Sequence, residues 1–229
     1  MIQEMMQDWW RDVVEYEYSL HVGLIIAVVV VVFGGRYGHR MYVSSRERAA
    51  QVLMAEAFED YSKAFYSSFD KDKATELSSQ LFEDAVIALD SVIESHKGSY
   101  LIPYTLAFKS NIALEKGNFK EAIELLEESI SLMSSTTPGF YLMKEKLALV
   151  QLDAGNVATA LKDLRDLALI KDNPHADKAA FDLGYYYWSK QDKKNAEESW
   201  KLLEVSDKKA SKKVSPWLAI AQDKLKQIS

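Results

Sequence analysis

A chain of 229 residues that is 48% hydrophobic is long enough and apolar enough to bury a core. It has no Cys, which excludes disulfide bonds, Cys-ligated metal sites and a thiol nucleophile, and its 9 Gly and 4 Pro are too few for the many turns of a sandwich or barrel. The formal charge of −6 argues against a dedicated nucleic-acid-binding protein, since phosphates require a basic surface, so we expect an all-α fold without a nucleic-acid partner.

The amino-terminal part contains a short acidic segment followed by an apolar one. Residues 1–17 hold 5 acidic side chains against the single Arg11, and residues 18–35 carry no formal charge. As a helix, the uncharged segment would be about 27 Å long, close to the roughly 30 Å of a bilayer's hydrocarbon core. Trp and Tyr before it, and Tyr and Arg after it, are typical of the two membrane interfaces. We predict a single transmembrane helix over residues 18–37.

Two other interpretations of the apolar segment compete with this one. A cleaved signal peptide has a basic start and a small-residue cleavage site, whereas this chain starts with an acidic segment of 17 residues. A buried strand or a core helix does not need a run of 5 consecutive Val. An uncleaved membrane anchor accounts for both features.

Residues 45–229 are predicted to form a continuous helical repeat domain. Apolar residues recur at steps of three and four between Ser45 and Tyr66 and again between Leu77 and Val92, as in two amphipathic helices. Further helical hairpins and a last helix are expected downstream. They lie near residues 103–134, 141–172 and 176–206, with a capping helix over residues 216–228.

The three hairpins align by their turns, which are 38 and 36 residues apart. Gly117, Gly155 and Gln191 are each followed by a polar residue that can cap the next helix, and five positions on by Ala. We expect each Ala to mark the place where the second helix of the hairpin comes close to a neighbour. A period in the middle thirties with paired helices is typical of a solenoid, in which each unit buries its apolar face by stacking on the next.

The hairpins resemble the tetratricopeptide repeat family. The third hairpin fits its motif best, the second fits in part, and the first departs from it at Ser110 and Leu126. The matching residues are Leu183, Gly184, Tyr187, Ala196 and Trp200 in the third hairpin, Leu147, Ala148, Gly155, Ala160 and Pro174 in the second, and Gly117, Phe119 and Ala122 in the first. The resemblance covers about half of the chain. The departures from the motif indicate divergent repeats.

The layout of the whole chain is similar to the YfgM-like ancillary subunits of the SecYEG translocon. The likeness is carried by the boundary Gly35-Arg36-Tyr37 and by the helix with the sequence from Ser44 to Gln51. It implies a repeat domain on the periplasmic side of a bacterial inner membrane that links the translocon with periplasmic chaperones. The arginine count points the other way, because Arg36, Arg40, Arg46 and Arg48 follow the apolar segment and favour a cytoplasmic side. We follow the resemblance, since long domains are exported largely regardless of charge.

No motif for catalysis, cofactor binding or metal binding is found. The 4 His are far apart and form no His-x-x-x-His or Glu-x-x-His pair, so we expect no metal site, no cofactor and no enzymatic activity. Carboxylate pairs such as Glu127-Glu128 are expected on solvated helix faces. A hydrolase with an unrecognised site is an alternative, which a deep polar pocket with perturbed carboxylates would favour.

The first helix of each hairpin is expected to line a concave protein-binding groove. The residues predicted to line it are Tyr104, Asn111, Leu149, Phe181, Tyr185 and Trp188. An alternative is that Tyr186, Tyr187 and Trp188 belong mostly to the core and close the array against Trp200 and Trp217. Asn111 alone matches the family's set of Asn, Lys and Arg that holds a peptide carboxylate, so capture of a carboxyl terminus is disfavoured.

The sequence therefore predicts a membrane-anchored adaptor at the bacterial inner membrane that binds translocon subunits, periplasmic chaperones or copies of itself. A cytoplasm-facing repeat scaffold for the assembly of a membrane complex is the alternative.

Overall fold

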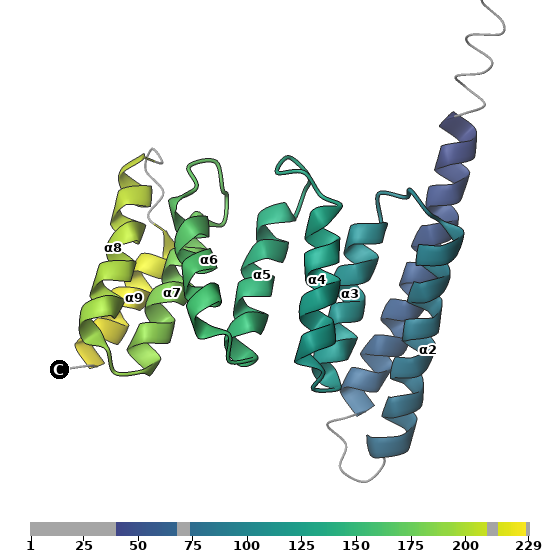
Figure 1. The fold of residues 1–229 in the computed structure, drawn as a ribbon, viewed down its shortest axis with the longest axis horizontal. Helices are drawn as coiled ribbons and strands as arrows, with labels where there is room; N and C mark the ends of the chain where they lie inside the picture. Colours follow the sequence, from purple (N-terminus) through teal and green to yellow (C-terminus); the bar gives the residue numbers. More distant parts are fainter. Residues whose placement is uncertain (1–39, 68–73, 210–214, 228–229) are drawn as a thin grey trace, which may run out of the picture. The chain divides into compact units, whose positions relative to one another are not determined.

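A computed structural model of the chain describes residues 40–67, 74–209 and 215–227 (Figure 1). The acidic segment 1–17 and the predicted transmembrane segment 18–37 lie outside these ranges. No helix among the described residues combines the length and the apolar composition that crossing a bilayer requires. The chain divides into two compact units, Met1–Val52 and Leu53–Ser229, and helices α2 to α9 all belong to the second.

Regular structure in the described ranges is entirely helical, which confirms the all-α prediction. A helix over residues 40–67 comes first. The helices after it are α2 (Ala74–Ser95), α3 (Ile102–Glu115), α4 (Phe119–Ser131), α5 (Phe140–Asp153), α6 (Val157–Leu169), α7 (Ala176–Ser189), α8 (Lys193–Lys209) and α9 (Pro216–Gln227). Helices α3 and α4, α5 and α6, and α7 and α8 pack as hairpins, each hairpin packs on the next, and α9 packs on α7 and α8.

The three turns inside the hairpins share one backbone conformation. Gly117, Gly155 and Gln191 have φ values of +73°, +85° and +62°, in the left-handed region. In each turn the next residue's N–H donates to the carbonyl five positions back, at 2.8 Å from Asn118, 2.8 Å from Asn156 and 2.9 Å from Asp192. This is the Schellman arrangement that satisfies the last carbonyls of a helix. The sequence alignment of Gln191 with the two glycines is thus confirmed by backbone geometry.

Replacing Gln191 with Gly is expected to stabilise the protein. A Cβ in the left-handed region costs roughly 1–2 kcal/mol, part of which Gly returns as conformational entropy of the unfolded chain. The net gain should be about 0.5–1 kcal/mol in the free energy of unfolding, measured by urea denaturation of the full chain in a mild detergent. The reverse change at Gly155 is the matched control and should lower stability by a similar amount, and an unchanged stability for Gln191→Gly would contradict the assignment.

The repeated alanines lie at tight helix contacts, as the spacing predicts. Ala122, Ala160 and Ala196 are each 0% exposed. Apolar clusters run along the stack, and each one joins a hairpin to the helix that follows it. One links α3 and α4 to Val150 of α5, and another links α7 and α8 to Ala221 of α9. The core is therefore a series of shared interfaces, and no hairpin buries its apolar face alone.

Polar contacts link α3, α5 and α7 to the residues that lie about one repeat further along the chain. The Tyr104 hydroxyl donates to the Pro138 carbonyl at 2.7 Å, and Lys178 Nζ of α7 lies 3.5 Å from Glu145 Oε1 of α5. The Trp188 indole N–H of α7 donates to the Lys224 carbonyl of α9 at 3.0 Å. Helix α9 thus contacts α7 as the first helix of a further repeat would.

Candidate protein-binding groove

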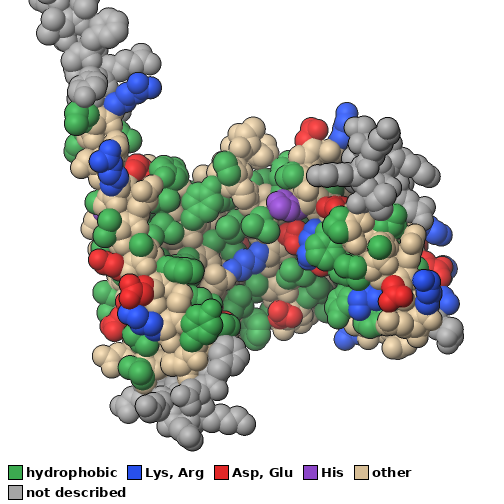
Figure 2. Space-filling view, turned by 180° about the vertical axis from the view of Figure 1, so that it is seen from behind, with side chains coloured by type: hydrophobic (Ala, Val, Ile, Leu, Met, Phe, Trp, Pro, Cys, Tyr) green, Lys and Arg blue, Asp and Glu red, His purple; other side chains and the backbone are tan. Residues whose placement is uncertain are grey.

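An apolar groove of about 370 Å³ lies beside α3, between α5 and the helix that ends at residue 67. We call it the α3–α5 groove. It is lined by Met54, Phe58 and Tyr61, by Tyr104, Ala107, Phe108 and Asn111 of α3, and by Met143 and Lys146 of α5. Figure 2 shows hydrophobic side chains gathered over this part of the surface.

Contacts between aromatic rings stabilise the wall of the groove that α3 shares with the helix that ends at residue 67. The ring centre of Tyr61 lies 5.1 Å from that of Phe108 and 5.7 Å from that of Phe82. Phe58 lies 5.9 Å from Phe108 and is still 60% exposed. A large aromatic side chain that is fixed on one side and open on the other provides contact area at little entropic cost.

The wall of the groove formed by α5 contains a cation, Lys146. Lys146 Nζ of α5 hydrogen-bonds Asn111 Oδ1 of α3. Burial lowers the pKa of Lys146, and no neighbouring carboxylate offsets the effect among the described residues. Sequence reasoning selected Asn111 and missed Lys146. Their separation of 35 residues, close to one repeat, is the signal that would have paired them.

Two of the six residues predicted to line a groove lie in the α3–α5 groove, and the other four do not. Tyr104 and Asn111 both line the α3–α5 groove. Leu149 is half-buried on α5 and is not among the residues that line it.

Phe181, Tyr185 and Trp188 lie on α7 and contact α9. Phe181 is only 8% exposed, with its ring centre 4.9 Å from that of Trp217. The ammonium of Lys224 on α9 lies 3.9 Å from the Trp188 ring centre and 4.8 Å from that of Tyr185. Tyr187 and Trp188, which the alternative assigned to the core, are half-buried and pack against the cluster that contains Trp200, while Tyr185 keeps 44% of its surface exposed. A direct role for these three in binding a partner stays a prediction.

Two buried carboxylates share one lysine between α5 and α7. Lys178 Nζ lies 2.5 Å from an oxygen of Asp182 and 3.5 Å from Glu145, whose side chains are 11% and 7% exposed. Burial raises the pKa of both carboxyls, partly offset by Lys178, and the Asp182 charge raises that of Glu145 further. Lys178 also lies 5.3 Å from the Trp217 ring centre. These contacts stabilise the packing of α5, α7 and α9, and neither carboxylate lines the α3–α5 groove.

Replacing Glu145 with Gln is expected to stabilise the chain at neutral pH by about 1 kcal/mol. A raised pKa means that the folded chain holds a proton which the unfolded chain has released, so stability falls as pH rises from the ordinary carboxyl value through the raised one. The advantage of Gln should therefore be near zero at about pH 4 and full at about pH 7.5. Urea unfolding at both pH values measures it, and an advantage independent of pH, or present in Glu124→Gln as well, would contradict the stated cause.

The described ranges contain no candidate metal site. No group of three or more His, Asp or Glu side chains comes close enough together to hold a metal ion there.

Comparisons with known proteins find structural neighbours at low similarity and no family. No protein-family model matches the chain, and no curated protein matches it. A tetratricopeptide repeat protein from Parabacteroides merdae aligns with a TM-score of 0.48 at 20% identity, over 74% of this chain and 60% of its own length. This chain therefore spans less than two thirds of that protein.

Two structures of nearly identical TPR-like repeats from Podosopora anserina align with TM-scores of 0.45, at 17% and 16% identity. The alignments cover 83% and 82% of this chain and 86% and 85% of theirs. Scores this low support no conclusion about what the chain binds, and the hairpin architecture above rests on the chain's own helices.

Proposed function

We propose that this chain is a membrane-anchored adaptor that binds other proteins through its helical repeats. The observation that carries the proposal is the α3–α5 groove, which combines an exposed aromatic side chain, Phe58, with a partly buried cation, Lys146. Such a surface binds polypeptide segments, since apolar contact supplies affinity and a single polar group fixes register.

The anchor in this proposal is the apolar segment over residues 18–37. Its lack of formal charge from Tyr18 to Gly35 and its aromatic and arginine flanks support a single span. The resemblance to YfgM-like subunits supports a place in the bacterial inner membrane, with the repeats in the periplasm and with translocon subunits and periplasmic chaperones as partners. The arginines after the segment support the alternative, a cytoplasmic scaffold.

Membrane attachment and orientation are tested together. The full chain should stay in the membrane fraction after carbonate extraction, and alkaline phosphatase fused after Ser229 should be active, because that enzyme works only after export. Val28→Lys with Val31→Lys should release the chain, since a charge at the centre of a span costs roughly 2.5–3.5 kcal/mol. An inactive fusion on a membrane-bound chain would favour the cytoplasmic scaffold, and a wild-type chain that is soluble without detergent would refute the anchor.

Binding in the α3–α5 groove is tested by site-specific photocrosslinking in membranes. A photoreactive residue at Phe58, which lines the groove, should give adducts that mass spectrometry identifies as translocon subunits or chaperones. Ile87 on α2 is the matched control, because it is 66% exposed and lies outside the groove. The same adducts from both positions, or none from Phe58, would count against the groove as the binding site.

A further inference from the structure

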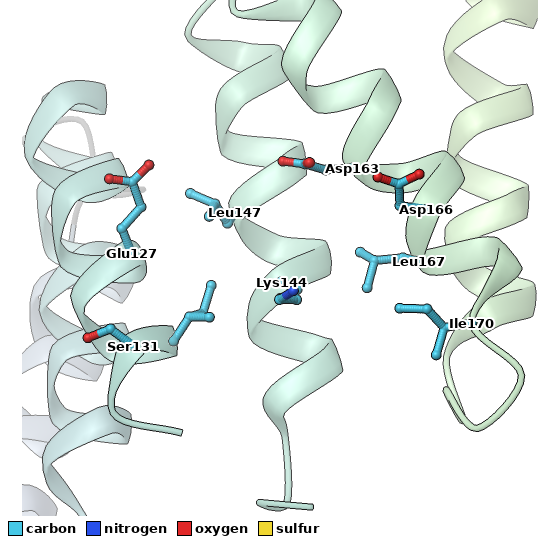
Figure 3. Close-up of a pocket in the computed structure, with 9 residues that line it drawn as sticks. Glu127, Ser131, Lys144, Leu147, Asp163, Asp166, Leu167 and Ile170 are labelled. Carbon is cyan, nitrogen blue, oxygen red and sulfur yellow. The ribbon is translucent and has the colours of Figure 1, made fainter. Parts of the chain in front are cut away.

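A second groove, of about 380 Å³, lies between α4 and α6 with α5 along its floor (Figure 3). We call it the α4–α6 groove. It is lined by Glu127, Ile130 and Ser131 of α4, Lys144 and Leu147 of α5, and Asp163, Asp166, Leu167 and Ile170 at α6. Helix α5 supplies different residues to the two grooves, Lys144 and Leu147 here and Met143 and Lys146 to the α3–α5 groove.

The interior of the α4–α6 groove is apolar. Leu167 is 3% exposed, and Ile130, Leu147 and Ile170 are half-buried. These side chains come from all three elements, so the apolar strip crosses the boundary between two successive hairpins. A half-buried apolar strip of this kind loses more contact with water when a second chain covers it.

The rim of the groove is acidic on both sides. Figure 3 places Glu127 on α4 at one wall, and Asp163 and Asp166 on α6 at the other. Asp166 lies 3.4 Å from Lys162, whereas among the described residues no Lys or Arg is within ion-pair distance of Glu127 or Asp163. The one cation that lines the groove, Lys144, has its ammonium 5.1 Å from the Phe140 ring centre.

The three helices around the groove together carry a net negative charge. Helix α4 carries 4 Glu and the single Lys120, which lies 3.9 Å from Glu124. Helices α5 and α6 each carry two basic and two acidic side chains, so the excess of acid comes from α4, and it favours cationic side chains over acidic ones at the rim.

We propose that the α4–α6 groove binds a basic, apolar peptide segment of a second protein. Apolar side chains of that segment cover the half-buried Ile130 and Leu147, and its Lys or Arg side chains lie along the strip with their cations at Glu127 and Asp163. Lys and Arg suit both parts of the site, because their methylene stems pack on apolar surface while their charged ends reach the rim. An adaptor with this site has two binding surfaces with opposite charge preference, since the α3–α5 groove carries the cation Lys146. The proposal goes beyond the proposed function and does not depend on the membrane topology.

The test measures peptide binding to the full chain in detergent by fluorescence anisotropy. The probes are labelled peptides of about twelve residues that alternate Leu with Lys, Leu with Glu, or Ser with Lys. The Leu–Lys peptide should bind most tightly, and its affinity should fall with rising salt, as expected for surface charges. A Ser–Lys peptide that binds equally well would remove the apolar strip from the site.

The decisive variant is Glu127→Lys with Asp163→Lys, which reverses the rim. It should lower the affinity for the Leu–Lys peptide by about tenfold or more and raise the affinity for the Leu–Glu peptide, because the charge at the rim changes from negative to positive. Glu124→Lys with Glu198→Lys is the matched control, since it changes net charge equally at exposed positions outside the groove and shares any background binding to detergent.

Three results would overturn the proposal. One is an equal loss of affinity for the Leu–Lys peptide in the rim variant and in the control variant, because net charge would then explain the binding. Another is that Glu127→Lys with Asp163→Lys weakens binding of the Leu–Lys peptide without strengthening binding of the Leu–Glu peptide. That result would mean that the variant distorts the groove. A third is sedimentation that shows a wild-type dimer abolished by the rim variant, which would make a second copy of this chain the occupant.

Discussion

Replacing Gly184 with Ala is expected to lower the free energy of unfolding by about 2–3 kcal/mol. A Cβ at Gly184 would lie 2.3 Å from Nε1 and 2.4 Å from Cδ1 of Trp200, so the indole must move. Trp200 is 3% exposed and its N–H donates to the Phe181 carbonyl at 3.0 Å, so movement breaks a buried hydrogen bond as well as close packing. Urea unfolding of the full chain measures the loss. Ser189→Ala, at an exposed position of α7, is the control and should change little.

A second pair of variants isolates the cause. In a Trp200→Leu background the same Gly184→Ala change should cost less than about 1 kcal/mol, because the indole that the Cβ would meet is gone and Ala favours a helix over Gly. An equal cost in both backgrounds would show that Trp200 is not what makes Gly184 necessary.

Replacing Trp217 with Ala is expected to cost about 2–3 kcal/mol and to loosen α9. The Trp217 ring lies against Phe181 and beneath the Lys178 ammonium, so its removal uncovers the aromatic cluster of α7. Ile220→Ala on the same helix removes an apolar side chain that is 43% exposed and should cost less than about 1 kcal/mol.

Hydrogen exchange provides a further readout of the Trp217 change. Amides of α9 should exchange faster in Trp217→Ala while those of α3 to α5 keep their protection, because each repeat contacts mainly its neighbours. Faster exchange over the whole chain would instead show global unfolding, and unchanged exchange in α9 would show that Trp217 does not anchor the cap.

The hairpins were predictable because their determinants are close together in sequence. A left-handed turn residue, a polar residue after it and an Ala five positions on define each hairpin within a few residues, and the structure shows this at Gly117, Gly155 and Gln191. The boundaries were less predictable. Helix α3 begins at Ile102, one residue before the expected start of its hairpin at residue 103. Helix α8 continues to Lys209, beyond the expected end of its hairpin at residue 206, since lysines fit a helix without contributing to the apolar pattern.

The candidate site was predictable only in part. Tyr104 and Asn111 were selected because they lie on the first helix of a hairpin, and they do line the α3–α5 groove. The groove's other wall comes from Met54, Phe58 and Tyr61, which the sequence pattern assigned only to a helix that must pack against something. Glu127, expected on a solvated face, is exposed and lies at the rim of the α4–α6 groove.

By itself the sequence determined that this chain forms helical hairpins in series, because turn geometry, capping and apolar period act over a few neighbouring residues. Only the tertiary structure decided which side chains remain open to a partner. That choice depends on how hairpins stack across separations of about 35 residues, which brings Lys146 to Asn111. It depends also on the docking of α9, which covers Phe181 with Trp217 and places Lys224 over Trp188. Residue spacing defines neither of these contacts, because both arise from packing between elements that are distant in the chain.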